Sequence, residues 1–178
     1  MNQLRNNLSA LFLIMMMPAL ASAASIYETQ ADFLDRAFSG SPPEPTIIWL
    51  SGDRKTSVRD ILGHDYPALR LRYWCTAARS AWVLEEIGKE LPITVGIIID
   101  EDHINSLRVL TYRENRGEEV VTPAFSDQFI NSSRDADGQL DKNIDGISGA
   151  TLSVRALTRL ATMALYLHAN SACNDDGA

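Results

Sequence analysis

The strongest structural signal in the 178-residue sequence is the run Ile93-Thr94-Val95-Gly96-Ile97-Ile98-Ile99. Branched side chains of this kind favour an extended backbone, so the run predicts a β-strand. The polar turn Asp100-Glu101-Asp102-His103 follows, and residues 104–112 then mix apolar and polar side chains as a second strand would. Because the connection is too short for a crossover, the two strands are expected to pair as an antiparallel hairpin.

Shorter elements are expected on the N-terminal side of this hairpin. Residues 24–38 predict an amphipathic helix, and residues 46–50 and 69–74 predict two short strands. The proline-rich segment 40–45 separates the helix from the first of these strands as a rigid connector. Residues 77–91 place apolar side chains at helical spacing and therefore predict another helix. Those side chains are Ala81, Leu84, Ile87 and Leu91.

Two helices are expected on the C-terminal side. Residues 122–130 predict a short helix that Thr122 opens, with Pro123 at its first position. A polar segment leads to residues 152–168, where apolar residues recur at helical spacing. Arg155 and Arg159 lie within this long helix, which indicates a packed helix and not a membrane span. The fold class is thus α+β, an antiparallel sheet with packed helices.

Composition and charge exclude several classes of protein. The hydrophobic content of 46% and the charged content of 22% fit one globular domain. Two cysteines are too few for a disulfide-dense scaffold or a four-cysteine zinc site, and no metal site is expected. The net charge of −7 argues against a general attraction to nucleic acid, so no nucleic-acid partner is expected.

Residues 1–23 have the pattern of an export signal. Arg5 supplies the positive charge, residues 8–20 are almost entirely apolar, and Ala21-Ser22-Ala23 forms a small-residue cleavage site. The apolar run is shorter than the roughly 20 residues that span a bilayer. We therefore expect a mature protein without a transmembrane span, in the periplasm or another extracytoplasmic compartment. Such a compartment permits a disulfide, and the sequence leaves open whether Cys75 and Cys173 pair.

Residues suited to chemistry gather in Asp145-Gly146-Ile147-Ser148-Gly149-Ala150-Thr151-Leu152-Ser153, where the last helix begins. Gly149 and Ala150 are small enough to let another group approach the backbone. The first turn of the helix offers unpaired N–H groups and the positive end of the helix dipole. The segment therefore predicts a site that favours a phosphate, with hydroxyl groups beside it.

Three other interpretations stay open from the residues alone. Ser148 or Thr151 could simply cap the helix. The pattern Asp141-x-Asn143-x-Asp145-Gly146 matches half of a calcium loop, although Leu152 stands where such a loop requires glutamate. Ser148 could also be a nucleophile in a near match to Gly-x-Ser-x-Gly, although no predicted strand precedes it and the only later histidine is His168.

The segment 145–151 also matches the flavinylation motif Asp-x-x-[Ser/Thr]-Gly-Ala-Thr, and the chain resembles the FMN-binding domain family. Members include the covalent-FMN domains of the C subunit of sodium-translocating NADH:quinone reductase and of the G subunit of the Rnf complex. The hairpin and the loop 112–117 add to a likeness that covers residues 69–167. It implies an FMN-binding domain at 69–170, preceded by an N-terminal helix, linker and short strand at 24–68 and followed by a tail at 171–178.

The resemblance implies that FMN is bound covalently through a phosphoester to Thr151. In the family, a flavin transferase moves the FMN half of FAD onto this hydroxyl and releases AMP. The other residues implied in cofactor binding lie in the motif and in the charged loop before it. They are Asp145, Ser148, Gly149, Ala150, Ser153, Glu114, Arg116 and Gly117. Larger relatives often have Glu-Thr-Pro-Gly in the loop, of which only Glu114 and Gly117 remain here. No catalytic residue is expected, because Thr151 would be a modification site.

The resemblance further implies an exported electron carrier between extracytoplasmic or membrane redox partners, such as a cytochrome or a membrane reductase. An acidic surface would suit a basic partner, for example a c-type cytochrome. Five aromatic residues could stack on the flavin ring, although each also fits the core. They are Trp49, Trp74, Trp82, Phe125 and Phe129. The other class of function that stays open is a non-redox binding module, for example one that calcium stabilises or one that stores flavin.

Overall fold

A six-stranded antiparallel sheet in the order β1-β6-β5-β4-β3-β2 forms the centre of the protein. The computed structural model describes residues 24–77 and 79–173, so the expected export signal lies outside the described residues. The strands are β1 Ser25–Ile26, β2 Thr46–Trp49, β3 Arg70–Thr76, β4 Arg79–Ile87, β5 Pro92–Asp100 and β6 His103–Tyr112. The predicted hairpin is β5 and β6, which confirms the central expectation from the sequence.

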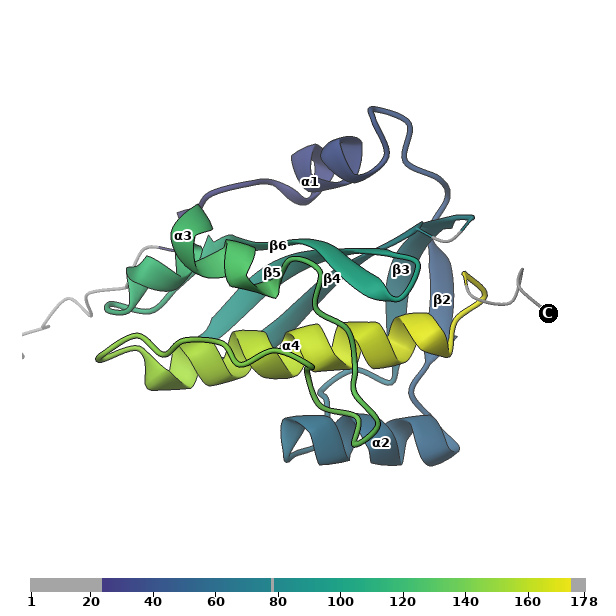
Figure 1. Cartoon of the computed structure of the whole chain (residues 1–178). Helices are drawn as coiled ribbons and strands as arrows, with labels where there is room; N and C mark the ends of the chain where they lie inside the picture. Colours follow the sequence, from purple (N-terminus) through teal and green to yellow (C-terminus); the bar gives the residue numbers. More distant parts are fainter. Residues whose placement is uncertain (1–23, 78, 174–178) are drawn as a thin grey trace, which may run out of the picture.

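Helices cover both faces of this sheet. They are α1 Gln30–Ala37, α2 Gly52–Leu62, α3 Pro123–Ser126 and α4 Thr151–Ala169, with two short 3₁₀ turns, η1 Glu118–Val121 and η2 Asp127–Phe129. Helix α1 lies on one face, α4 runs along the other, and α2 packs on the outer side of α4 (Figure 1). The α+β class is confirmed. In the part of the chain that the structure describes, no helix is both long enough and apolar enough to cross a membrane.

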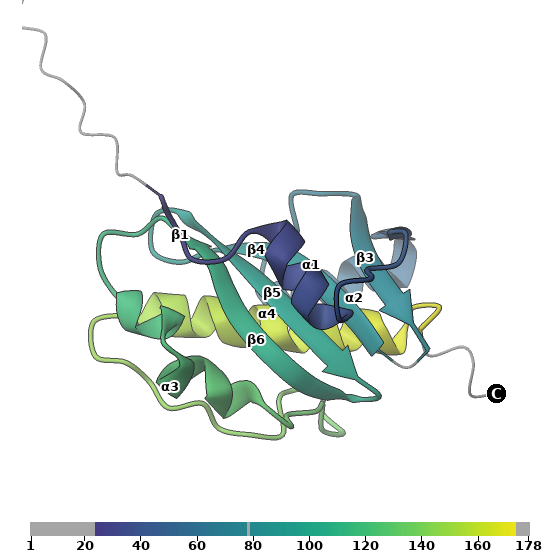
Figure 2. The ribbon, with the colours of Figure 1, turned by 90° about the horizontal axis from the view of Figure 1, so that it is seen from above.

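The core has two parts, one on each face of the sheet. The larger part lies between the sheet and α4, where Trp82, Leu107 and Leu157 are fully buried. The smaller part lies under α1, which crosses over the strands in Figure 2. There the Phe33 ring packs so closely on Gly96 that a Cβ at this position would lie 2.6 Å from it. Burial on both faces explains why β5 is apolar almost throughout.

The prediction of a helix at residues 77–91 is wrong, because residues 79–87 form the interior strand β4. Ala81 packs in the core under α1, whereas Trp82 and Leu84 pack in the core against α4. A strand covered on both faces has apolar residues on both, so the alternation typical of a half-buried strand is lost. Four of the apolar residues in this segment, Ala81, Leu84, Ile87 and Leu91, happen to be spaced as in a helix, which explains the wrong prediction.

The N-terminal segment also differs from its prediction. Residues 24–38 are not one helix, because Ser25–Ile26 pairs with the edge of β6 as β1. Helix α1 begins after Thr29, whose hydroxyl caps it by accepting a hydrogen bond from the Asp32 N–H (3.1 Å). The sequence predicted no element at residues 51–68, where α2 lies. The long C-terminal helix agrees with its prediction to within one residue at each end.

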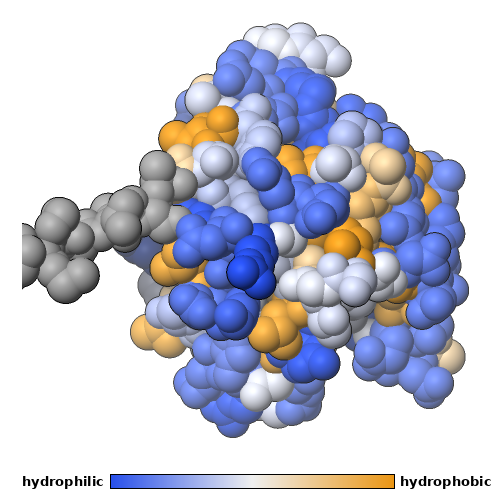
Figure 3. Space-filling model, turned by 90° about the vertical axis from the view of Figure 1, so that its left-hand side faces the viewer, coloured by the Kyte–Doolittle hydropathy of each residue, from blue (hydrophilic) through white to orange (hydrophobic). Residues whose placement is uncertain are grey.

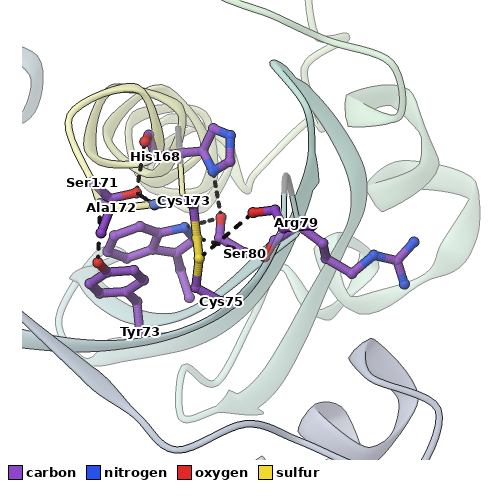
Figure 4. Close-up of a disulfide and its surroundings, with 10 residues drawn as sticks. Tyr73, Cys75, Arg79, Ser80, His168, Ser171, Ala172 and Cys173 are labelled. Atoms are coloured by element: carbon purple, nitrogen blue, oxygen red, sulfur yellow. Dashed lines mark hydrogen bonds between the residues drawn. A yellow bond between two sulfur atoms is a disulfide. The ribbon is translucent and has the colours of Figure 1, made fainter. Parts of the chain in front are cut away.

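Cys75 and Cys173 form a disulfide, which answers the question that the sequence left open. Their Cα atoms are 5.8 Å apart, and the bond ties the chain beyond α4 to β3 (Figure 4). Beside it, the Ala172 N–H donates to the Tyr73 hydroxyl (3.3 Å), and the Ser80 hydroxyl lies 2.8 Å from His168 Nδ1. The C-terminal end of α4 is therefore fixed to the sheet both covalently and by hydrogen bonds.

Candidate functional site at the start of α4

Thr151 is the first residue of α4, and its side chain is exposed. The residue before it, Ala150, occupies the N-cap position, and no side chain of the described residues caps this end. The Ala150 N–H closes the preceding turn by donating to the Ile147 carbonyl (3.0 Å). Ser148 and Thr151 therefore do not cap the helix, so capping does not explain their hydroxyl groups. The first turn keeps its attraction for an anion.

Two glycines shape the backbone around Thr151. Gly149 has φ +84°, a conformation that favours glycine. Apart from its chain neighbours, no described residue has an atom within 4 Å of the position that its Cβ would take. Gly117 also has a positive φ, +83°, but there a Cβ would lie 2.8 Å from the Ala150 Cβ. The loop after β6 thus packs directly against the start of α4, while the space beside Gly149 is left open.

Tyr112, at the end of β6, connects this loop to the helix. Its hydroxyl donates to the Arg116 carbonyl (2.6 Å) and lies 3.2 Å from the Ser153 hydroxyl. Burial raises the pKa of Tyr112, so its hydroxyl stays protonated and available as a donor. Ser153 is only 3% exposed, and its hydroxyl faces this tyrosine. Within the described structure, Ser153 therefore joins α4 to the loop.

Glu114 organises the opposite wall of the site. One of its carboxylate oxygens accepts hydrogen bonds from three successive N–H groups, those of Lys89 (2.6 Å), Glu90 (2.7 Å) and Leu91 (3.0 Å). Partial burial by itself would raise the pKa of Glu114, but the three donors outweigh it and hold the pKa below its ordinary value. The carboxylate is therefore charged at neutral pH and fixes the β4–β5 turn beside the loop.

Two grooves meet at this site. One, of about 640 Å³, has Lys89, Glu90 and Glu114 on one wall and residues 149–153 on the other. The second, of about 940 Å³, has Tyr27, Val121 and Pro123 among its lining residues, together with Ser148. Asn115, Arg116 and Gly149 line both. Figure 3 looks onto this end of the molecule, where hydrophobic patches break a mostly hydrophilic surface. Both volumes are in the range of small-molecule sites.

The residues expected to bind the cofactor are brought together, although they do not all face the grooves. Thr151, Gly149, Ala150, Ser153, Glu114 and Arg116 line the smaller groove, and Ser148 and Gly117 line the larger one. Asp145 is exposed and lies outside the lining of both grooves, and its N–H donates to Gln128 Oε1 (2.8 Å). A phosphate at Thr151 would meet the first-turn N–H groups and the open space at Gly149, so the residues present fit a phosphate-linked ligand.

Three residues that line the grooves, Tyr27, Lys89 and Glu90, were not predicted from the sequence to be part of the site. They come from β1 and its continuation and from the β4–β5 turn, far from the motif in sequence. No local pattern could have identified them, since the sheet alone brings these segments together. Of the five aromatic residues expected near the flavin, Trp74, Trp82, Phe125 and Phe129 are buried. Trp49 is exposed, but it lies on β2, at the sheet edge opposite β1.

The calcium and serine-nucleophile interpretations find no support in the geometry. Both carboxylate oxygens of Asp141 accept hydrogen bonds from Ser133. Within residues 24–77 and 79–173, no group of three or more potential ligands is arranged for a metal ion. His168 lies near the far end of α4, about 25 Å along the helix axis from Thr151, and its Nδ1 is bonded to Ser80. It cannot act as a base for Ser148.

Comparison with known proteins agrees with this geometry. Residues 88–166 match the family model described as FMN-binding domain. This segment runs from the β4–β5 turn, through the loop that Glu114 and Gly117 organise, and into α4. No curated protein matches the chain. The matched segment holds most of the lining of both grooves, and Tyr27 is the member that comes from outside it. Residues 88–166 are therefore similar to the FMN-binding domain family, and flavin binding is the function that this match supports.

Proposed function

We propose that the protein is an exported flavoprotein that carries electrons, with FMN joined by a phosphoester to Thr151. The observation that carries the proposal is the position of Thr151, exposed at the first residue of α4 where two grooves meet. Bound FMN would supply the ability to accept and release one or two electrons. The protein would contribute attachment, electrostatics and a surface for its partners.

Attachment would be a phosphoryl transfer from FAD, carried out by a flavin transferase. The Thr151 oxygen would form a bond to the phosphorus nearer the riboflavin, while the bond from that phosphorus to the AMP oxygen breaks. AMP would leave with the electron pair, and the hydroxyl proton would pass to a base or to solvent. No electron is gained or lost overall. This protein's part is to present the hydroxyl on an accessible helix end, which the exposure of Thr151 permits.

Each of the other site residues has a role that fits its place. The first-turn N–H groups, the Ser148 hydroxyl and Arg116 would hold the phosphate, and Gly149 and Ala150 would leave room for it. Asp145 lies outside both grooves, so it would act on the threonine hydroxyl only within the complex with the transferase. Glu114, Gly117 and Ser153 would act through the fold, because their contacts hold the loop and the β4–β5 turn against α4.

Two observations support an extracytoplasmic location. The pattern of residues 1–23 is that of a cleaved export signal. The disulfide between Cys75 and Cys173 is of a kind that persists in oxidising compartments. There a cofactor that dissociated could not easily be replaced, which gives covalent attachment a physical reason. The redox partners would be a cytochrome or a membrane reductase, met by diffusion.

The test is to export the full chain from cells that also express a flavin transferase. After denaturation and electrophoresis, we expect flavin fluorescence to stay with the polypeptide, and Thr151→Ala to abolish it. Thr56→Ala is the matched control, since Thr56 is an exposed threonine on α2 that lines neither groove, and its loss should leave the fluorescence unchanged. Mass spectrometry should place the added mass of FMN on the peptide that contains Thr151. Wild-type protein that is colourless under these conditions would refute the proposal.

A further inference from the structure

We propose that Tyr27 forms an aromatic wall of the flavin site and that the isoalloxazine ring lies against it in the larger groove. This inference rests on the function proposed above, because it requires a flavin attached at Thr151. It assigns a binding role to a residue that lies outside the segment matched by the family model. The argument depends on the lining of the two grooves and on the contacts that hold Tyr27.

Of the two grooves that meet at Gly149, only the larger one suits a flat aromatic ring. The smaller groove is lined mainly by polar and charged residues, and its one large apolar side chain is Leu152. The larger groove adds an aromatic ring, Tyr27, to the apolar side chains of Val121 and Pro123. A flat aromatic ligand gains most from such walls. A phosphate at the start of α4 would leave the ring free to enter this groove past Gly149.

Tyr27 is held in place although its side chain is not buried. The residue is 43% exposed, so its ring has a face available to a ligand. Its N–H donates to the Leu110 carbonyl (2.9 Å), directly after β1 has paired with β6. Its hydroxyl donates to a carboxylate oxygen of Glu118. With both ends fixed, the ring loses little conformational entropy when a ligand packs on it.

The hydrogen bond to Glu118 also keeps the Tyr27 hydroxyl in its protonated form. The hydrogen bond to Glu118 raises the pKa of Tyr27, so the phenol stays protonated and continues to donate. No other aromatic residue lines either groove in the described part of the chain. If an aromatic side chain of this chain stacks on the flavin, Tyr27 is the one that the geometry supplies.

Flavin fluorescence gives a direct readout of this contact. An electron-rich phenol in contact with an excited isoalloxazine quenches its emission by giving an electron that then returns, so no net oxidation occurs. Phenylalanine is a much poorer donor, and tryptophan is a better one. In flavin-loaded protein we expect Tyr27→Phe and Tyr27→Leu to raise the fluorescence yield and lifetime several-fold. Tyr27→Trp should keep the emission quenched.

The control is Trp49→Leu, which removes an exposed aromatic ring from the opposite edge of the sheet. It should leave the lifetime unchanged. The flavin content of each variant is measured by absorbance after denaturation, so that attachment and stacking are scored separately. Loaded Tyr27→Phe protein with the wild-type lifetime would overturn the inference and leave the proposed function intact. Wild-type protein without covalent flavin would instead overturn the proposed function, and the inference with it.

Discussion

At the scale of single residues, Glu114 shows how a site residue can act entirely through the backbone. Its carboxylate caps the β4–β5 turn, because one oxygen accepts hydrogen bonds from three N–H groups of that turn. The same turn forms one wall of the smaller groove. A resemblance to a family motif identifies such a glutamate, but only the structure shows that its partners are the N–H groups of residues 89–91.

Replacing Glu114 by glutamine should destabilise the protein by roughly 1 kcal/mol at neutral pH. A neutral amide oxygen accepts hydrogen bonds more weakly than a carboxylate, and partial exposure reduces the difference. The pKa of Glu114 is lowered in the folded state from an ordinary value of 4.5, so its stabilisation is fully present above that pH. It is lost as the pH falls through the lower, folded-state pKa. Urea unfolding of both proteins between pH 7 and pH 3 measures the difference.

Glu90→Gln provides the control for this prediction. Glu90 is in the same turn, but its side chain is 69% exposed and pairs only with Lys89 among the described residues. Its replacement should change the free energy of unfolding by a few tenths of a kcal/mol at most. If Glu114→Gln and wild type unfold at the same urea concentration at pH 7, the charge of the Glu114 carboxylate adds no stability to the three hydrogen bonds.

At the scale of elements, α4 joins two regions with different roles. Its first turn carries the candidate site, and its last turn leads to the disulfide that ends on β3. Hydrogen bonds beside the disulfide, from Ala172 to Tyr73 and between Ser80 and His168, fix the same end (Figure 4). Because the two ends are far apart, the disulfide should stabilise the fold without taking part in flavin binding.

We therefore expect the variant with both Cys75→Ser and Cys173→Ser to lose about 2–4 kcal/mol of stability, since the bond closes a loop of 98 positions. Reductant should destabilise wild type by a similar amount and have no effect on the variant. Guanidinium unfolding with and without reductant measures both. Covalent flavin per molecule should be equal in folded samples of the two proteins. A loss of flavin from folded variant protein would show that the disulfide does shape the site.

Elements whose apolar residues recur at a regular spacing, or whose ends carry local signals, could be predicted from the sequence. Helix α4 has apolar residues at helical spacing along its whole length. Helix α3 begins at Pro123 after the N-cap residue Thr122, as expected, but it ends at Ser126 and a 3₁₀ turn follows where the prediction extended the helix to residue 130. Strand β4 could not be predicted, because one of its faces packs under α1 and the other against α4, so its apolar residues do not alternate with polar ones. Helix α2 was missed because only Val58 and Leu62 are buried in its eleven residues, which gives almost no periodic signal.

Some residues of the candidate site could likewise be predicted from the sequence, and others could not. The motif residues 145–151 and the loop 114–117 are each continuous in sequence, so a local pattern identified them. Tyr27 and the turn at residues 89–90 join the site only because β1 and the β4–β5 turn lie beside the end of β6. Sheet order of this kind is a tertiary property, and no local pattern in those segments encodes it.

At the scale of the whole molecule, charge is the property that would decide how redox partners approach. The net charge is −7, and the expected export signal contributes one arginine and no acidic residue, so the mature protein is also acidic. Some of this charge lies at the site, where the exposed Glu118 and Glu119 line the larger groove. A basic partner would therefore be attracted towards the end of the molecule where the flavin is proposed to sit.

The rate of electron transfer from the reduced, flavin-loaded protein to a basic c-type cytochrome should thus fall as salt is added. Between about 0.01 M and 0.15 M ionic strength the screening length shortens from roughly 30 Å to 8 Å, which weakens attraction before contact. Ferricyanide, an anionic acceptor, should react faster with added salt because repulsion is screened. Glu119→Gln should slow the cytochrome reaction at low salt, and Glu44→Gln, exposed in the 40–45 connector, should not. Stopped-flow absorbance measures each rate, and a cytochrome rate independent of salt would exclude electrostatic docking at this end of the molecule.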